Sequence, residues 1–410
     1  MTEKLLTVEE ALAKVLEPIT PLGIERVDLL NALGRLIRED ITSPMDVPLT
    51  PNSAMDGYAV KAEDLEKATS DNPIKLKVIE DLPAGYLAKS KVENGQAIRI
   101  MTGATIPDGA DSVVMVEVTK KSDDGFVEVF ESVKVGQHIR LRGEDLQTGD
   151  LLIKTGTVLN AAEIGVLASV QRPFVKVARQ PIVAILSTGD ELVEIEDPIS
   201  PGKVVNSNSY SLAALVRASG AIPIVQPIAR DSEQEIRTAI QASLAADFVV
   251  SSGGVSVGDY DYVKTVLDSL GADLKFWRVS MKPGKPIAFG LLAGKPYFGL
   301  PGNTVSSMLS FLLFVRPALR KAMGYLPPWT MPTVDVTLDS RAGSKGDRRT
   351  YLRANLRYED GRFYARLAPR QGSGVLSSML GANALVILEE GVTALNAGSQ
   401  AKAMVIGNIF

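Results

Sequence analysis

The chain contains no cysteine and a single histidine among its 410 residues. Without cysteine there is no disulfide framework, no thiolate nucleophile, no iron–sulfur cluster and no cysteine-ligated zinc. One histidine leaves no histidine-rich metal site and disfavours histidine-based acid–base catalysis. Any chemistry must therefore depend on Asp, Glu, Lys, Arg, Ser and Thr side chains and on backbone amides, which favour hard cations and phosphate-like oxyanions as ligands.

Long apolar runs and an excess of positive charge are also missing. The longest apolar stretch with helical spacing, Met308 to Val315, is far shorter than the ~20 residues that span a bilayer. The N-terminal segment carries acids within an amphipathic pattern, unlike a secretory signal. With 44 basic and 48 acidic residues the net charge is −4, which disfavours binding of nucleic acid through its phosphates. These features predict a cytoplasmic protein that binds neither membranes nor nucleic acid.

The length predicts more than one domain, because a domain typically has about 150 residues. Thr7 and Glu10 have the spacing of a capping box, which predicts a helix that ends before Pro18. Apolar spacing predicts a second helix over 28–37, and helical spacing returns at 160–170. Short alternating runs between them indicate a β-rich insert. We therefore predict a discontinuous N-terminal domain at 1–46 plus 146–180, interrupted by the insert at 47–145.

The second half of the chain divides into two patterns. From 181 to 327, apolar strands alternate with helices, an order that predicts a parallel sheet covered on both faces. From 328 to 410 the pattern is again that of short strands. The predicted fold class is thus multidomain α/β and β, with an α/β domain at 181–327 that carries the site and a β domain at 328–410.

Three loops of the predicted α/β domain follow strands and lead into helices: 187–191, 251–261 and 300–304. In open α/β sheets, ligands bind at this carboxyl edge. Glycines let backbone amides approach an oxyanion, hydroxyls donate hydrogen bonds, and neighbouring carboxylates hold Mg²⁺. Each loop alone is more often an ordinary tight turn, but three together favour a site. Their spacing matches neither the dinucleotide fingerprint nor the P-loop.

Basic residues gather in two further segments. The sequence Met-Lys-Pro-Gly-Lys-Pro at 281–286 places Lys282 and Lys285 on a turn stiffened by two prolines, with Arg278 just upstream. The alternatives are a basic surface turn and a fixed anion site. The last domain contains seven arginines, which indicate either a solvated strand face or an anion-binding rim. They are Arg348, Arg349, Arg353, Arg357, Arg362, Arg366 and Arg370.

A family resemblance follows from these motifs taken together. Seven segments occur in the order and approximate spacing found in the molybdopterin molybdenumtransferases, enzymes similar to the C-terminal domain of gephyrin, and the resemblance covers essentially the whole chain. The segments are SAMDGYAV, IRIMTGA, RGEDL, STGDEL, SSGGVSVGDYDYVK, KPGKP and LPGNTVSS.

The resemblance implies a four-domain homodimer whose α/β domain binds molybdopterin and is followed by a β-barrel-like domain. It also implies a reaction in which adenylylated molybdopterin and molybdate yield molybdenum cofactor and AMP with the help of Mg²⁺. Another expected partner is the adenylyltransferase of the same pathway. Two other functions stay open: a dimeric scaffold that binds a peptide, and a molybdopterin adenylyltransferase, which would consume ATP rather than release AMP.

The same resemblance assigns roles to individual residues. Glu191, Asp231 and Asp261 would line the pterin–nucleotide pocket, and Glu191 and Asp261 would be the metal ligands. Lys282, Lys285 and Ser306 would contact molybdate or the pyrophosphate, and Arg278 stands at a basic position of the family. The glycine-rich loops would contribute substrate-binding groups from Thr188, Gly189, Ser252, Gly253, Gly254, Pro301, Gly302 and Asn303.

Other domains would complete the site. The insert, which in the family faces the α/β domain of the other subunit, would contribute Asp56, Thr102, Arg140 and Asp145. Arg353 and Ser373 would reach in from the last domain. One departure stands out, because the family loop usually reads PGNPVS and this chain has Thr304 in place of the second proline. We expect the change to alter loop rigidity rather than function.

Overall fold

The computed structural model describes residues 5–254 and 262–408. The chain folds into two compact units. The first unit comprises residues 1–25, 34–36 and 177–410, and the second comprises residues 26–33 and 37–176. No helix within the described ranges is long and apolar enough to cross a membrane. The finer division into four domains stays a prediction.

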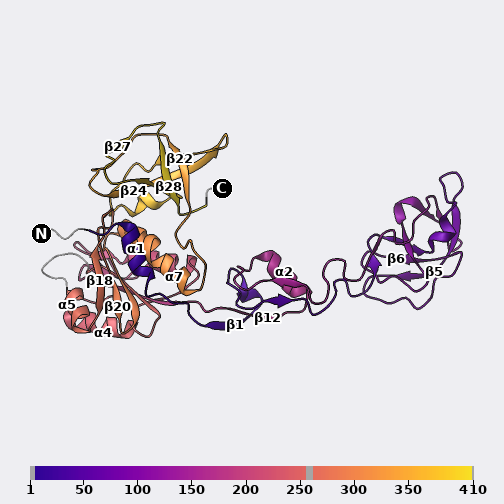
Figure 1. Cartoon of the computed structure of the whole chain (residues 1–410), viewed down its shortest axis with the longest axis horizontal. Helices are drawn as coiled ribbons and strands as arrows, with labels where there is room; N and C mark the ends of the chain where they lie inside the picture. The colour runs from indigo at the N-terminus through magenta and orange to yellow at the C-terminus, as the bar shows by residue number, and fades with distance from the viewer. Residues whose placement is uncertain (1–4, 255–261, 409–410) are drawn as a thin grey trace. The chain divides into compact units, whose positions relative to one another are not determined.

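The first helix, α1 (Val8–Leu16), begins with the capping box expected from the sequence. The Thr7 hydroxyl accepts the Glu10 N–H at 3.1 Å, and the Glu10 carboxylate accepts the Thr7 N–H at 2.8 Å. Because apolar residues recur at helical spacing, one face of α1 is buried in the core of the first unit. Figure 1 shows this helix, in indigo, beside α7 (Arg316–Ala322), in orange.

A six-stranded sheet of order β16-β13-β17-β21-β20-β18 forms the centre of the first unit. The first four strands are parallel, as expected, whereas β20 and β18 are antiparallel to their neighbours. The difference arises because a tight turn at Ala293 and Gly294, both with positive φ, joins β20 directly to β21. The strands are β13 (Ile182–Ser187), β16 (Ile222–Val225), β17 (Phe248–Ser252), β18 (Asp273–Arg278), β20 (Pro286–Leu292) and β21 (Lys295–Leu300).

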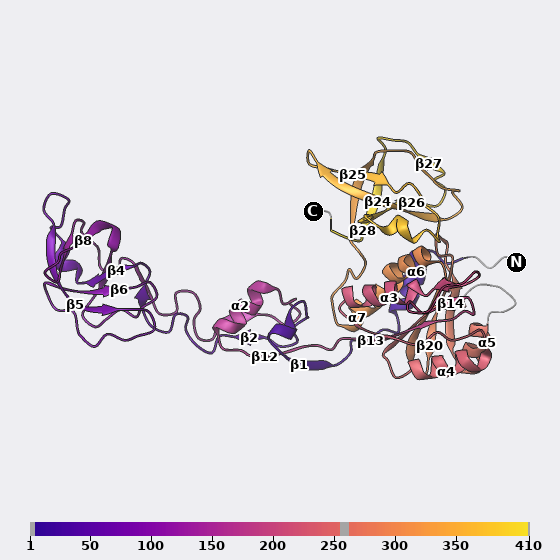
Figure 2. The same cartoon turned by 180° about the vertical axis from the view of Figure 1, so that it is seen from behind.

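Helices cover both faces of this sheet, as the alternation of strands and helices predicted. Neighbouring strand residues point to opposite faces, so that Val250 packs in the core with α1, α3, α6 and α7, while Val249 packs with α4 and α5. Figure 2 shows α3 and α6 on one side and α4 and α5 on the other. The remaining helices are α3 (Ser207–Ala218), α4 (Glu233–Ser243), α5 (Tyr262–Ser269) and α6 (Thr304–Ser310), which continues through a π-helical segment (Phe311–Val315) into α7.

The C-terminal strands form a closed five-stranded barrel of order β24-β25-β22-β28-β26, completed by pairing of β24 with β26. A short strand of the lysine loop, β19 (Met281–Lys282), pairs in parallel with the start of β24, so that Lys282 lies opposite Thr350. The sequence 281–286 is thereby joined to the barrel wall. The barrel strands are β22 (Thr333–Leu338), β24 (Arg349–Glu359), β25 (Arg362–Leu367), β26 (Ala384–Leu388) and β28 (Gln400–Val405).

The second unit contains the expected β-rich insert, a six-stranded sheet of order β7-β4-β6-β5-β9-β8. Its strands are β4 (Gly57–Val60), β5 (Ile74–Leu82), β6 (Gln96–Ile100), β7 (Ser112–Met115), β8 (Thr119–Lys121) and β9 (Phe126–Val129). Helix α2 (Ala161–Ser169) follows the insert, as expected. Short strand pairs are β1 (Ile24–Asp28) with β12 (Phe174–Ala178), β2 (Ile41–Thr42) with β11 (Leu151–Ile153), and β3 (Asn52–Ser53) with β10 (Ile139–Arg140).

The helix expected over 28–37 is absent, and the prediction was wrong. This segment holds the end of β1 and one short turn of 3₁₀ helix at Leu30–Ala32. The Asp28 carboxylate accepts both the N–H and the side-chain amide of Asn31, and this local bonding favours a turn over a helix. Gly34, with φ of 74°, then breaks the helical path.

Candidate functional site

The carboxyl edge of the parallel strands brings together residues of the three loops singled out in the sequence, and residues 255–261 of the second loop lie outside the described ranges. The ends of β13 and β17 and the loop after β21 line a small cavity of about 70 Å³, here called the sheet-edge cavity. Gly253, with φ of 97°, carries its Cα to the Thr188 carbonyl, where a Cβ would lie 2.9 Å from that oxygen. Of the predicted site residues, this cavity is lined by Thr188, Glu191, Ser252, Gly253 and Gly302.

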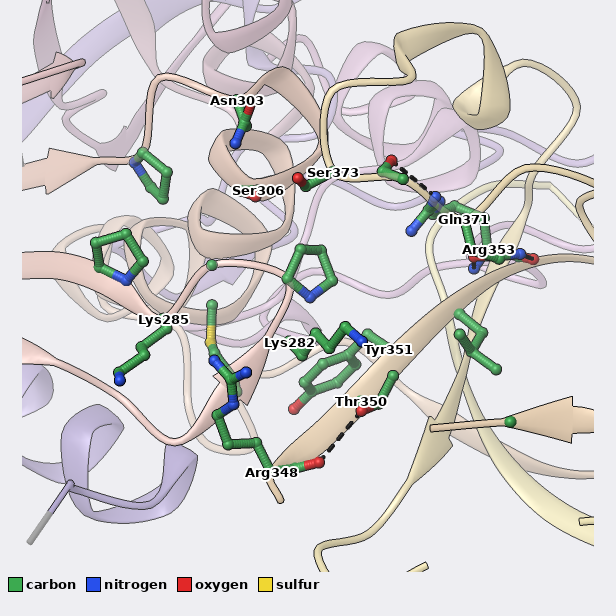
Figure 3. Close-up of a pocket in the computed structure, with 18 residues that line it drawn as sticks. Lys282, Lys285, Asn303, Ser306, Arg348, Thr350, Tyr351, Arg353, Gln371 and Ser373 are labelled. Atoms are coloured by element: carbon green, nitrogen blue, oxygen red, sulfur yellow. Dashed lines mark hydrogen bonds between the residues drawn. The ribbon is translucent and has the colours of Figure 1, made fainter. Parts of the chain in front are cut away.

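A second cavity in the first unit, of about 470 Å³, lies between the lysine loop, the start of α6 and the barrel, and is here called the cationic pocket (Figure 3). Lys282, Lys285 and Arg348 supply its positive charge. Figure 3 shows Lys282 and Lys285 pointing in different directions from their loop. The predicted site residues in this pocket are Lys282, Lys285, Pro301, Asn303, Ser306, Arg353 and Ser373.

One loop borders both cavities. Pro301 and Asn303 line the cationic pocket, whereas Gly302 between them lines the sheet-edge cavity. The two cavities therefore share a wall formed by residues 301–303. Helix α6 begins directly after this loop, with Asn303 in the N-cap position and Thr304 as the first helical residue.

The lysine loop has a fixed backbone. Gly284 adopts φ of 101°, and a Cβ on it would lie 2.4 Å from Cε of Met281 and 3.1 Å from Oγ of Ser310. Pairing of β19 with β24 holds the first lysine against the barrel. No carboxylate within the described ranges forms an ion pair with Lys282 or Lys285. Two ammonium groups on a rigid turn are suited to an oxyanion.

Arg353 is buried and acts on the shape of the pocket wall. Its side chain, 1% exposed, donates to Oγ of Ser378 at 3.1 Å and to the carbonyls of Arg370 (3.2 Å) and Gly372 (3.1 Å). The Gln371 side chain bridges the backbone N–H and C=O of the same arginine at 2.9 Å each. Burial lowers the pKa of Arg353. This arginine therefore anchors the loop at 370–373.

The anchored loop meets α6. The Ser373 carbonyl accepts the Val305 N–H at 3.2 Å, which satisfies one of the free donors at the helix start. In Figure 3, Ser373 lies beside Ser306. The barrel thus contributes a wall of the cationic pocket and also completes the N-terminal turn of a helix in the α/β region.

Arg348 and Tyr351 add to the pocket from the start of β24. Arg348 forms an ion pair with Asp347 at 3.0 Å. Burial raises the pKa of the Asp347 carboxyl, but the hydrogen bond and charge of Arg348 and the charge of Lys282 outweigh it, and the net shift is downward. Burial raises the pKa of Tyr351 to about 12, so this phenol is neutral at physiological pH.

The seven arginines of the last domain have different surroundings. Arg348 and Arg353 line the cationic pocket. Arg349 is paired with Glu9 and Glu389, and Arg357 with Asp339 and Glu359. The arginines therefore form neither one solvated face nor one continuous anion-binding rim.

Four predicted residues of the first unit line neither cavity. Gly189 and Gly254 lie within the loops after β13 and β17. Asp231 and Asp190 each donate a backbone N–H to the carboxylate of the other at 3.2 Å. Arg278 lies at the exposed end of β18. Asp261 lies outside the described residues. The structure does not bring Arg278 together with the two lysines in the cationic pocket.

The second unit holds the four remaining candidates in two places. The Asp56 carboxylate accepts the N–H and the hydroxyl of Thr102, each at 2.7 Å, and these hydrogen bonds lower its pKa. Arg140 and Asp145 line one cavity of about 450 Å³, together with Asn52 and Glu144.

Sequence reasoning missed Thr350, Tyr351 and Gln371 in the cationic pocket. In the sequence, Tyr351 is one residue of an alternating strand. The pairing of β19 with β24 brings Tyr351 to the lysine loop, and no sequence signal predicts this pairing across 67 residues. Gln371 carries no motif. Its position directly after Arg370, in a strand-rich region of basic residues, was the one available signal.

Comparison with known proteins gives matches along the whole chain. Residues 6–170 match the family described as "MoeA N-terminal region (domain I and II)", residues 184–321 match "Probable molybdopterin binding domain", and residues 335–406 match "MoeA C-terminal region (domain IV)". These three segments cover α1 with most of the second unit, most of the α/β sheet and most of the barrel.

Two similar whole proteins are named molybdopterin molybdenumtransferase. The molybdopterin molybdenumtransferase of Nostoc sp. is 42% identical over 379 residues, which are 91% of this chain and 87% of that protein. The one from Haemophilus influenzae is 36% identical over 392 residues, 94% of this chain and 95% of that protein. The solved molybdopterin biosynthesis MoeA protein from Pyrococcus horikoshii has a TM-score of 0.79 at 32% identity and covers 99% of this chain and 100% of that chain.

Proposed function

Because this chain belongs to the molybdopterin molybdenumtransferase family, we propose that it inserts molybdenum from molybdate into adenylylated molybdopterin with release of AMP. The observation that carries this proposal is the shared wall at 301–303. A pocket lined by four cationic residues and a cavity at the carboxyl edge of the sheet lie on the two sides of one loop. Such an arrangement suits an oxyanion and an organic phosphate ester that must react with each other.

The chemistry requires that two anions come together. Molybdate and the phosphoanhydride of an adenylylated substrate repel each other in water. Fixed cations lower this repulsion most where the protein holds them in place before the substrate arrives. Lys282 and Lys285 on the stiff turn and Arg348, just before β24, would bind molybdate. The hydroxyls of Ser306 and Ser373 would orient its oxygens. No covalent protein intermediate is required.

Mg²⁺ fits the residues present, although no group of three metal-ligating side chains occurs within the described ranges. Mg²⁺ usually takes one or two protein carboxylates and completes its shell with water and substrate phosphate. Glu191, which lines the sheet-edge cavity, would hold it, together with Asp261, which lies outside the described residues. The ion would supply positive charge at the phosphoanhydride.

The active assembly we propose is a homodimer in the cytoplasm. The family resemblance suggests that Asp56, Thr102, Arg140 and Asp145 complete the site of the other subunit. It also suggests the adenylyltransferase of the same pathway as a partner, because that enzyme would supply the adenylylated substrate.

The direct test is mass analysis of the product after the protein is mixed with adenylylated molybdopterin, Mg²⁺ and molybdate. We expect molybdenum cofactor and AMP in equal amounts without ATP. Lys282→Ala should slow AMP release about tenfold to a thousandfold, because a cation that stabilises developing or approaching charge is lost. The matched control is Lys275→Ala, a lysine of β18 paired with Asp273 outside both cavities.

Three results would contradict the proposal. The first is a wild-type protein that releases no AMP although it folds and binds substrate. The second is ATP consumption, which would favour an adenylyltransferase. The third is an equal effect of Lys282→Ala and Lys275→Ala, which would mean that the cationic pocket has no special role.

A further inference from the structure

Two asparagines on one wall of the sheet-edge cavity have hydrogen-bonding groups that the protein leaves unused. Asn206 precedes α3 and is 1% exposed, and Asn208 lies two residues later in the first turn. Both line the cavity beside Ser252 and Gly302. Within the described residues, Nδ2 of Asn206 and Oδ1 of Asn208 are buried and have no hydrogen-bond partner.

The neighbouring backbone fixes which end of each amide is unused. Oδ1 of Asn206 accepts the Ser209 N–H at 3.3 Å, so the free end of this side chain is the NH₂ donor. Nδ2 of Asn208 donates to the Gly302 carbonyl and to Oγ of Ser252, each at 2.7 Å. A carbonyl accepts only, so the amide cannot be flipped, and the free end of Asn208 is the oxygen acceptor.

A buried donor or acceptor without a partner is unfavourable, so such groups are usually matched by water or by a ligand. Here the two residues that carry the unpaired donor and the unpaired acceptor line the same cavity. A volume of about 70 Å³ is too small for a whole bicyclic ring but large enough for the edge of one. A ring edge that carries an acceptor next to a donor would satisfy both asparagines at once.

Resting on the proposed function, we infer that Asn206 and Asn208 select the heterocycle of the substrate through such an edge. The pterin lactam, a C=O beside an N–H, has this pattern, with the C=O for the Asn206 amide and the N–H for the Asn208 oxygen. The adenine of the AMP moiety offers a similar pair, an amino group beside a ring nitrogen. Both rings are fused pyrimidines. Measuring the binding of molybdopterin and of AMP separately shows which of the two rings is recognised.

The test variant is Asn206→Asp. Aspartate caps a helix as well as asparagine does, so the hydrogen bond to Ser209 and the helix should remain. The free NH₂ donor is replaced by a carboxylate oxygen, which repels a carbonyl or a ring nitrogen. The matched control is Asn160→Asp, the same change at the N-cap of α2 in the second unit, where Asn160 stands in a capping box with Glu163.

Binding is measured by fluorescence titration with molybdopterin and, separately, with AMP, in the absence of molybdate. Asn206→Asp should weaken the affinity for one of the two ligands by roughly tenfold to a hundredfold, as loss of a buried hydrogen bond to a matched group does. Loss of molybdopterin binding identifies the pterin, and loss of AMP binding identifies the adenine. Asn160→Asp should bind both like the wild type.

The inference is overturned if Asn206→Asp binds both ligands with wild-type affinity while it unfolds at the wild-type urea concentration. If Asn206→Asp unfolds at a lower urea concentration than the wild type, Asn206→Ser is measured instead, because serine also caps a helix but lacks the amide. Wild-type affinity of Asn206→Ser for both ligands then overturns the inference. Because no turnover is measured, a wild-type protein that binds molybdopterin but inserts no molybdenum would contradict the proposed function and leave this inference standing.

Discussion

Thr304 occupies the first position of α6, where the family motif has proline. The N–H at this position has no partner within a helix, so proline loses no intrahelical hydrogen bond there and its fixed φ suits the helix start. The preceding Asn303, with φ of −66° and ψ of 121°, already has the extended conformation that a residue before proline requires. Threonine is therefore compatible with the native loop, but it leaves the unfolded chain freer.

Thr304→Pro should consequently stabilise the protein by about 0.4–1 kcal/mol, through the smaller entropy of the unfolded chain. Urea unfolding measures the change, with Thr304→Ala as the control that removes the side chain without restricting φ. A lower midpoint for Thr304→Pro than for Thr304→Ala would show that the 301–303 wall needs the freedom that threonine gives it.

Single functional residues can be predicted from the sequence where the residue type alone is informative. The lysines of 281–286 and the residues of the PGN loop could be singled out, because glycine and proline next to charged or polar residues indicate a built turn. Asn206 and Tyr351 could not. Their importance depends on which atoms are left unpaired or become buried, and only the packed structure determines that.

Among the elements, two neighbouring strands of the α/β sheet, β13 and β17, begin at a shared ion pair. The Asp247 carboxylate, just before β17, accepts from Arg179 at 2.7 and 3.0 Å and from the Ile182 N–H at the start of β13 at 2.8 Å. Burial raises the pKa of Asp247, but these hydrogen bonds and the charge of Arg179 outweigh it and the pKa is lowered. The ionised form is thus the one that aligns the strands.

Asp247→Asn should destabilise the protein by about 1.5–3 kcal/mol near neutral pH, as loss of a charged hydrogen-bond partner does. Because the folded pKa lies below the ordinary value of 3.8, the contribution is present above that pH and disappears as the pH falls through the folded value. Urea unfolding at about pH 7 and about pH 3 should show the gap between wild type and variant closing in acid.

The control is Asp273→Asn, which breaks the exposed pair with Lys275 and should cost less than about 1 kcal/mol. A gap that stays constant between the two pH values would contradict the assignment of the charge to Asp247.

Elements with strong local signals were predictable, and those fixed by distant contacts were not. The capping residues of α1 and the apolar spacing of α4 appear in a short window of sequence. The stretch 28–37 has similar apolar spacing, yet Leu30 and Leu33 are 84% and 62% exposed, so no core covers a helical face there. The antiparallel pairing of β20 with β21 follows from a two-residue turn, which a prediction based on strand–helix alternation overlooks.

For the whole molecule, the proposed homodimer makes a prediction that no single-site variant can test. Two variants, Lys282→Ala in the first unit and Arg140→Ala in the second, should each slow AMP release strongly. If each site draws on both subunits, a mixed dimer has one intact site and one doubly altered site. Unfolding and refolding an equal mixture should then restore about one quarter of the wild-type rate, since about half of the dimers are mixed.

AMP release and native mass spectrometry together measure this outcome. The control mixes Lys282→Ala with Lys285→Ala, two changes on the same loop, which should restore nothing. Recovery absent from the first mixture, although mixed dimers are seen by mass, would mean that each chain builds its site from its own residues.

The thin partition made by Pro301, Gly302 and Asn303 has a thermodynamic consequence. A segment that contacts two ligands couples their binding, because a change caused by one ligand alters the affinity for the other. The affinities change by the same factor in both directions. Whatever factor molybdate exerts on the affinity for the pterin nucleotide, the nucleotide must exert on molybdate. The order in which the two ligands bind would then affect the rate at which the ternary complex forms but not its stability.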